Sequence, residues 1–249
     1  MVILNYMKSN KNNKKVGVLG YGEIGHAIAK FYRNPKIKDL KRDDGLEGIE
    51  ILHICIPWSD KFIDVVKKEI KEIKPKLTII HSTVAPGTTK KVGEMTVHSP
   101  VRGVHPKLYE GIKTFVKFVG ADNKKAGDLA KKHLKSLGIK AEVFYPSITT
   151  ELGKILDTTY YGVCIAWHGE MKEICDKFNV DFESAVTDFN KTYNEGYIKL
   201  NRAKFVRPVL YPPQNGKPKH CIVPNATILS KYYKTPIFEL LLKKYRNKL

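Results

Sequence analysis

The sequence predicts an α/β fold, a Rossmann-like doubly wound parallel sheet followed by a helical second domain. Short apolar strands alternate with amphipathic helices over residues 15–145, and the pattern then changes to long helices. A GxGxxG spacing at Gly20, Gly22 and Gly25 directly follows the first strand. We therefore expect an NAD-binding domain over residues 1–147. The predicted second domain, residues 148–249, is helical with a loop-rich C-terminal end and serves dimerisation or substrate binding.

The first strand is predicted over Lys15 to Leu19, and an apolar helix opens after the glycines. In this arrangement the first glycine permits a tight turn, and the second lets the backbone approach a pyrophosphate. The third lets helix and strand pack closely, and the helix N-terminus supplies amide donors. A glycine turn without a ligand is the alternative, but the position between a buried strand and an apolar helix favours a dinucleotide.

The second strand is predicted over Ile37 to Arg42, and Asp43 follows it. A carboxylate at this point accepts hydrogen bonds from the adenosine ribose of NAD and repels the 2′-phosphate of NADP. The segment "DDG" is also a favourable turn, so both interpretations of Asp43 stay open. The next buried strand, "IEILHICIPW", begins only about seven residues later, which is too short for a parallel helical crossover. This predicts a reduced and open adenine side.

The remaining elements alternate as expected for this fold. The segments predicted as helix, strand, strand, helix and strand are "DKFIDVVKKEIKEIKP", "KLTIIHSTVAPGTT", "TFVKFVG", "NKKAGDLAKKHLKSLG" and "IKAEVFY". Beyond Pro146 we expect one long helix from Ile148 to Phe178 and a second from Phe182 to about Leu200. A proline-rich loop region and a short helical tail complete the prediction.

Charge and composition narrow the class of partner. Lysine and arginine number 44 against 25 acidic residues, a net charge of +19. This favours anionic small molecules, although a lysine-rich proteome gives the same balance. No motif interleaves aromatic and basic residues, so nucleic acid is not favoured. No apolar run reaches about eighteen residues, and the start of the chain is too polar for a signal peptide, so we expect a cytoplasmic protein without a membrane span. The four cysteines form no CxxC pair, and we expect no metal site.

The long helix carries a candidate catalytic lysine. Lys154 lies three to four residues before Asp157 and Thr158, which can hold its side chain in one rotamer. Near a nicotinamide this lysine could act as general acid or base, or stabilise an alkoxide. A solvated helix face with a local ion pair is the alternative.

Four further segments carry a resemblance to a known family. The segments are "VGVLGYGEIG", "HSTVAPGTT", "HSPVRGVHPK" and "ELGKILDTTYYG", and "KHCIVPN" follows them at Lys219 to Asn225. In this order they resemble the UDP-glucose/GDP-mannose dehydrogenase family of nucleotide-sugar 6-dehydrogenases, over roughly residues 15 to 225. Members of that family oxidise a sugar 6-hydroxyl twice with NAD, through a thiohemiacetal and a thioester on a cysteine.

The resemblance implies a set of site residues. Lys154 matches the catalytic lysine, Cys221 the nucleophile, and Thr83 a threonine near the nicotinamide. The predicted catalytic set is Lys154, Cys221, Thr158 and Asp157. The predicted cofactor-binding set is Gly20, Tyr21, Gly22, Glu23, Ile24, Gly25, Asp43, Ile56, Pro57, Ser82 and Thr83.

The sequence also departs from the family pattern. Val101 replaces a glutamate that serves thioester hydrolysis, Thr158 replaces an asparagine, and Asn225 replaces an aspartate. The family's C-terminal UDP-binding domain is missing from the match. Cys221 has three possible roles, as a nucleophile, a metal ligand or a small packing residue. The resemblance favours the nucleophile.

We therefore expect an NAD-dependent oxidoreductase acting on an alcohol of a sugar-derived or small anionic substrate. The alternative is a Rossmann-type nucleotide-binding protein of the same descent that has lost dehydrogenation or uses another adenosine cofactor such as S-adenosylmethionine. The long helix is apolar on more than one side, and the equivalent helix of the resembled family lies at a dimer interface, so we expect a homodimer.

Overall fold

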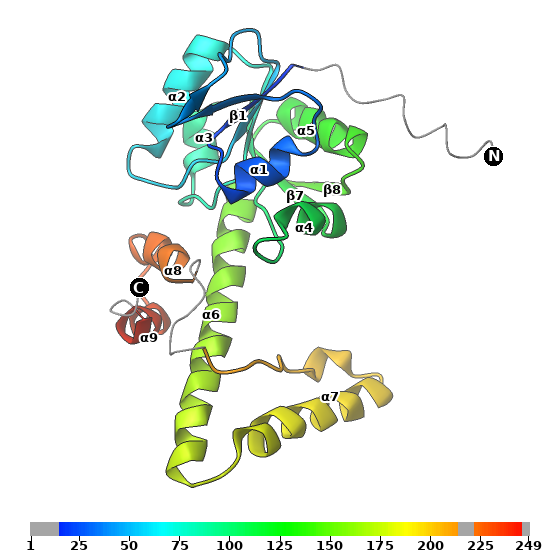
Figure 1. Cartoon of the computed structure of the whole chain (residues 1–249), viewed down its shortest axis with the longest axis vertical. Coiled ribbons are helices and arrows are strands. Elements are labelled where there is room, and N and C mark those ends of the chain that lie inside the picture. The colour runs from blue at the N-terminus through cyan, green and yellow to red at the C-terminus, as the bar shows by residue number, and fades with distance from the viewer. Residues whose placement is uncertain (1–14, 214–221, 246–249) are drawn as a thin grey trace, which may run out of the picture. The chain divides into compact units, whose positions relative to one another are not determined.

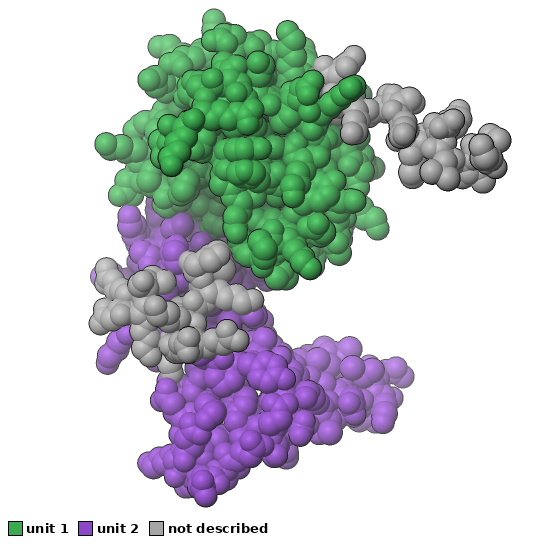
Figure 2. Space-filling model, viewed as in Figure 1, with its two compact units in different colours: residues 1–154 green, residues 155–249 purple. Residues whose placement is uncertain are grey.

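The computed structural model describes residues 15–213 and 222–245 of the 249-residue chain (Figure 1). The chain divides into two compact units, residues 1–154 and residues 155–249 (Figure 2). The predicted domain boundary, between residues 147 and 148, lies at the start of helix α6 at Ile148, whereas the two compact units divide within α6, after Lys154.

The first unit contains an eight-stranded sheet with the order β3-β2-β1-β4-β5-β6-β7-β8. Its strands are β1 Val16–Leu19, β2 Lys36–Asp39, β3 Arg42–Asp43, β4 Ile51–Ile54, β5 Leu77–Ile80, β6 Thr96–His98, β7 Lys117–Ala121 and β8 Ala141–Phe144. In the spatial order β2-β1-β4-β5-β6, each strand is parallel to its neighbour, as predicted. The Rossmann-like fold class predicted from the sequence is confirmed.

The sheet is nevertheless mixed rather than wholly parallel, which corrects the prediction. β6 pairs with β7 in the antiparallel direction, and β8 then lies parallel to β7. The short helix α4 (Leu108–Thr114) connects β6 to β7, so the chain re-enters the sheet from the edge at which β6 ends. Neither β6 nor α4 was predicted from the sequence.

Helices cover both faces of the sheet, as a doubly wound fold requires. On one face α1 (Glu23–Ala29), α4 and α5 (Lys124–Ser136) contribute to a core with β1 and β5. On the other face α2 (Phe62–Ile73) and α3 (Thr88–Val92) contribute to a second core. Each strand of about four residues supplies side chains to both faces because successive side chains alternate.

The second strand is shorter than predicted. β2 ends at Asp39, Leu40 and Lys41 form a turn, and β3 returns antiparallel to β2. The predicted strand from Ile37 to Arg42 is therefore wrong, because the chain reverses at Leu40 into a hairpin. No helix lies between β2 and β4, and all of residues 36–51 are described. The expected absence of the usual crossover at the adenine side is thus confirmed.

The helices beyond Pro146 follow the prediction closely. α6 extends from Ile148 to Lys177. The second predicted helix begins with a π-helical segment, Glu183–Asp188, and continues as α7, Phe189–Lys199. Two further helices are α8, Ile222–Ser230, and α9, Pro236–Tyr245. Within the described residues, no helix combines the length and apolarity that crossing a bilayer requires.

The prediction placed Ile222 to Asn225 in a loop, and the structure corrects this. Pro224 lies in the first turn of α8, where a helix tolerates proline because the amide it lacks would have no partner there.

One row of the first core contains an unexpected histidine. The strand registers align Val18, His53, Ile79 and Val97 across four neighbouring strands. His53 is 1% exposed. His81, directly after β5, and His98, the last residue of β6, are also buried. Burial lowers the pKa of His53 and of His81 well below the usual range, and lowers that of His98 to about 3. The folded chain therefore holds these rings neutral.

This burial predicts a protein that loses stability in mild acid. An unfolded histidine takes up a proton below about pH 6.5, whereas these three must shed theirs to fold. The stability they contribute is therefore complete above that pH and falls as pH decreases. For each histidine we expect a total loss of about 1.4 kcal/mol between about pH 7.5 and 5.5, measured by urea unfolding, with most of the loss below about pH 6.5.

The matched control is His26→Gln, because the ring of His26 is exposed and its loss should leave the slope unchanged. A free energy of unfolding that stays constant over this range would contradict the prediction.

Candidate active site

The glycine loop joins β1 to α1, and its three glycines have different roles. Gly20 has a φ of +92°, and a Cβ there would lie 2.8 Å from the backbone of Cys55. A Cβ on Gly25 would lie 2.0 Å from the carbonyl oxygen of Gly20. A Cβ on Gly22 would meet no atom within 4 Å. The fold itself thus requires Gly20 and Gly25, whereas Gly22 faces open space in which a ligand can approach the backbone.

A carboxylate lies beside this loop, but it is not the predicted one. Asp39, the last residue of β2, accepts a hydrogen bond from the Tyr21 amide at 2.6 Å. Asp43 lies in β3 and accepts from the Gly45 amide at 2.9 Å, within its own turn. Sequence reasoning missed Asp39 because it extended β2 to Arg42. The observable signal was the acidic end of the segment "KIKD", since the ribose-binding carboxylate of this fold ends the second strand.

The Ser-Thr loop, residues 82–89, follows β5 and contacts the segment just after β4. The Ser82 hydroxyl donates to the carbonyl oxygen of Ile56 at 2.6 Å. Two predicted cofactor residues are therefore brought together, with Thr83 and Ile56 both partly exposed. The ring of His98 contacts the Ser82 carbonyl oxygen at 3.1 Å and the Thr150 hydroxyl at 2.8 Å.

A buried carboxylate fixes the far end of the same loop. Glu151, fully buried in α6, accepts hydrogen bonds from the Gly87 amide at 2.5 Å, the Thr89 amide at 2.7 Å and the Thr89 hydroxyl at 2.6 Å. We call this arrangement the Glu151 clasp. Burial raises the pKa of Glu151, and the donors on Thr89 and Gly87 oppose that rise. Glu151 belongs to the segment "ELGKILDTTYYG", but its role was not predicted from the sequence.

Lys154 lies on α6 three residues after the clasp and is partly buried. Its charge contributes to the lowered pKa of His98, after burial and the charge of Lys117. It likewise contributes, after burial, to the lowered pKa of Lys117. Lys154 therefore lies within electrostatic reach of the residues behind the Ser-Thr loop.

The other predicted catalytic residues are not brought into one described site. Asp157 is exposed on α6, and Thr158 is buried. Cys221, His220 and Lys219 lie outside the described residues. Val101 is 6% exposed in the apolar core of the first unit, and Asn225 is buried in α8. Among the described residues, no group of three or more metal-binding side chains is arranged to hold a metal ion.

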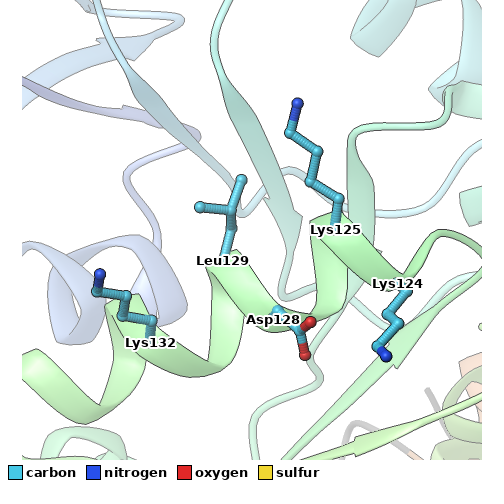
Figure 3. A pocket seen from close by; sticks show the side chains of 5 residues that line it. All are labelled: Lys124, Lys125, Asp128, Leu129 and Lys132. Carbon is cyan, nitrogen blue, oxygen red and sulfur yellow. The ribbon is translucent and has the colours of Figure 1, made fainter.

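A separate hollow lies over α5, with a volume of about 530 Å³ (Figure 3). It is lined by Lys124, Lys125, Asp128, Leu129 and Lys132. In Figure 3 the side chains of Lys124 and Lys125 point in different directions, so they do not converge on one ligand. The hollow is a solvated lysine-rich helix surface rather than a second site.

Comparison with known proteins identifies relatives of this chain. UDP-N-acetyl-D-mannosamine dehydrogenase of Methanococcus maripaludis is 26% identical over 197 residues, which cover 76% of this chain and 43% of that protein. The chain is homologous to the nucleotide-sugar dehydrogenases. This bears out the resemblance to the UDP-glucose/GDP-mannose dehydrogenase family, although the match spans less than half of this relative. No family model matches the sequence.

Solved structures show the same fold. UDP-D-ManNAc dehydrogenase of Pyrococcus horikoshii superposes with a TM-score of 0.73 at 17% identity, covering 94% of this chain and 68% of that one. 3-Hydroxyisobutyrate dehydrogenase of Mycobacterium tuberculosis superposes with a TM-score of 0.67 at 12% identity, covering 94% and 93%. The architecture is thus common to nucleotide-sugar and hydroxyacid dehydrogenases.

The Glu151 clasp yields a direct stability prediction. Glu151→Gln keeps the side-chain shape but replaces one acceptor oxygen by an NH2 group, which cannot accept a hydrogen bond from the loop. One buried donor should be left unmatched, which costs about 1–3 kcal/mol of unfolding free energy. Urea denaturation measures this.

Glu142→Gln, on an exposed position of β8, is the matched control and should change stability by less than about 0.5 kcal/mol. Equal unfolding midpoints for the Glu151 variant and the wild type would show that the clasp does not hold the loop.

Proposed function

We propose that this chain is an NAD-dependent oxidoreductase that oxidises an alcohol of a sugar-derived or small anionic substrate. The observation that carries the proposal is the Glu151 clasp, which binds the Ser-Thr loop to α6. Glu151 lies about one helical turn before Lys154 on that helix. A loop that borders a cofactor and a lysine that can move a proton are thereby held in the same compact unit.

The residues present fit a dinucleotide. The open space at Gly22 leaves the loop backbone accessible to a pyrophosphate, and α1 begins directly after it. Asp39, at the end of β2, would accept hydrogen bonds from the adenosine ribose. Ile56, Ser82 and Thr83 would border the nicotinamide. When bound, NAD supplies the hydride acceptor.

Lys154 would do the proton chemistry. As a neutral amine its Nζ takes the hydroxyl proton of the substrate while the adjacent carbon loses its hydride, which leaves a carbonyl group. Protonated Lys154 stabilises the negative charge on that oxygen during the reaction, before the hydride has fully left. The chain's net charge of +19 supports an anionic substrate.

The residue at position 101 does not support a complete four-electron oxidation to a free acid. The family glutamate that serves thioester hydrolysis is replaced here by a valine buried in the apolar core. A carbonyl product would therefore leave the site, or an acyl group on Cys221 would hydrolyse slowly.

The cofactor assignment is tested by paired aspartate variants. Asp39→Asn should weaken NAD binding by about tenfold or more, equivalent to about 1.4 kcal/mol, because it removes the charged acceptor beside the loop. Asp43→Asn should leave the affinity nearly unchanged, because that side chain is engaged in its own turn. Isothermal titration calorimetry measures both, and the reverse order of effects would restore the prediction made from sequence.

The catalytic assignment is tested by removing the amine. Lys154→Met should lower turnover by at least about a hundredfold while NAD affinity stays unchanged. NADH formation can be followed with UDP-N-acetylmannosamine and 3-hydroxyisobutyrate as probes. Lys140→Met, at an exposed lysine, is the control and should keep wild-type turnover. A Lys154 variant as active as this control would remove the lysine from the mechanism.

We also propose that the chain forms a homodimer through α6. Exposed apolar side chains follow one stripe of this helix, at intervals of four and seven residues: Leu156, Tyr160, Trp167, Ile174 and Phe178. Such a stripe on a long helix is typical of an interface. Trp167→Glu should convert a dimer into a monomer in sedimentation velocity at micromolar concentration.

Tyr233→Glu, at an exposed aromatic residue outside α6, should remain dimeric. A monomeric wild type would contradict the proposal.

A further inference from the structure

A continuous chain of hydrogen-bonded ionisable side chains lies inside the first unit. The Tyr32 hydroxyl contacts Nε2 of His133 at 2.7 Å and Nε2 of His53 at 2.8 Å. Nδ1 of His53 contacts Nε2 of His81 at 2.8 Å. Nδ1 of His81 contacts Nζ of Lys117 at 3.2 Å. Each histidine and the lysine is at most 3% exposed.

Burying so many ionisable groups is costly, and an apolar row would pack the same space at lower cost. The strand neighbours of His53 are the apolar residues Val18 and Ile79, so the histidine interrupts an otherwise apolar row. The hydrogen bonds offset the cost of burial, but they do not explain why the groups are ionisable.

The chain can be satisfied in two opposite directions. In the first, the proton of His81 Nδ1 is donated to the Ser99 carbonyl oxygen at 2.9 Å, and His81 Nε2 accepts from His53 Nδ1. In that direction Tyr32 donates to His53 and accepts from His133. In the second, His81 Nδ1 accepts from Lys117, and every later donor and acceptor exchanges roles. Both directions satisfy all the bonds because a neutral imidazole has one donor and one acceptor nitrogen.

We propose that this chain, from Lys117 through His81, His53 and Tyr32 to His133, is a proton relay that serves the active site. The inference rests on the proposed oxidoreductase function, since oxidation of an alcohol releases one proton. His81 directly precedes Ser82 of the Ser-Thr loop. The second member of the relay is therefore adjacent in sequence to the residues proposed to border the nicotinamide.

The proton balance is simple. Lys117 gives one proton to His81 Nδ1, and His81 gives its Nε2 proton to His53 Nδ1. His53 gives its Nε2 proton to Tyr32, and Tyr32 gives its hydroxyl proton to His133 Nε2. His133 then holds the one extra proton. No electrons move, and each intermediate group ends with the number of protons with which it began.

The electrostatics at the Lys117 end support transfer. Burial lowers the pKa of Lys117, so its ammonium form gives up a proton readily. The charged Lys154 and Arg102 lower it further, and Cys55 opposes them. Nζ of Lys117 also donates to the carbonyl oxygens of Ser99 and, at 2.8 Å, Pro100, which holds it in place.

Tyr32→Phe tests the relay because it removes one hydroxyl and keeps the ring. The readout is the ¹⁵N spectrum of the histidine side chains, which distinguishes the two tautomers without substrate or cofactor. In the wild type we expect His53 and His81 to change tautomer together over one pH range. In Tyr32→Phe this joint change should be lost at His81 as well as at His53, although His81 does not touch Tyr32.

Tyr109→Phe is the matched control, since Tyr109 is also a partly buried tyrosine packed on the same core. It should behave as the wild type does. If Tyr32→Phe does not fold, His133→Gln breaks the chain one link further along. Fixed tautomers in the wild type, or a change confined to the residues that touch Tyr32, would overturn the relay.

The kinetic arm separates this failure from failure of the proposed function. With NAD and either probe alcohol, Tyr32→Phe should show a larger solvent deuterium isotope effect on turnover than Tyr109→Phe. Equal isotope effects in an active protein would contradict the relay alone. No NADH formation by the wild type would contradict the oxidoreductase proposal, while the tautomer experiment would still decide whether the chain is coupled.

Discussion

The rest of the site depends on the buried carboxylate of Glu151 and on the three hydrogen bonds that it accepts. Glu151 reaches from α6 to the amide groups of Gly87 and Thr89 at the start of α3. A buried carboxylate is stable only when its oxygens are occupied, and the donors of the Ser-Thr loop occupy them. The same contacts set the position of the loop relative to the first turns of α6. Lys154 lies one helical turn later, so the same contacts also fix its position relative to the loop. Glu151 therefore contributes both to stability and to the proposed catalytic geometry.

A second constraint is the basic interior of the sheet. Burial lowers the pKa of His53, of His81 and of Lys117, and the hydrogen bonds among these side chains offset part of the cost of burying them. Protonating one member places a charge in a region that already contains other basic groups. The fold therefore couples the stability of its core to pH. The proposed relay uses the same property, because groups that resist holding a proton pass it on.

The sequence predicted the elements whose signals are local. β1 and the glycine loop follow from an apolar strand and glycine spacing, and α6 from a long helical pattern, and all three are found where expected. It failed where long-range pairing decides, as with the hairpin that ends β2 at Asp39 and the antiparallel β7. The Glu151 clasp spans 62 to 64 residues, and the histidine chain crosses up to 101, so neither has a local pattern. A histidine inside the apolar segment "ILHICIPW" was the one visible sign of the chain.

The central claim is that the open space at Gly22 and the carboxylate at Asp39 together form an NAD site. Calorimetric titration of the full chain with NAD, NADP and S-adenosylmethionine tests it most directly. The account predicts one NAD per chain and much weaker binding of NADP, because a 2′-phosphate would meet the Asp39 carboxylate. Binding of S-adenosylmethionine in preference to NAD, or no binding of any of the three, would contradict it.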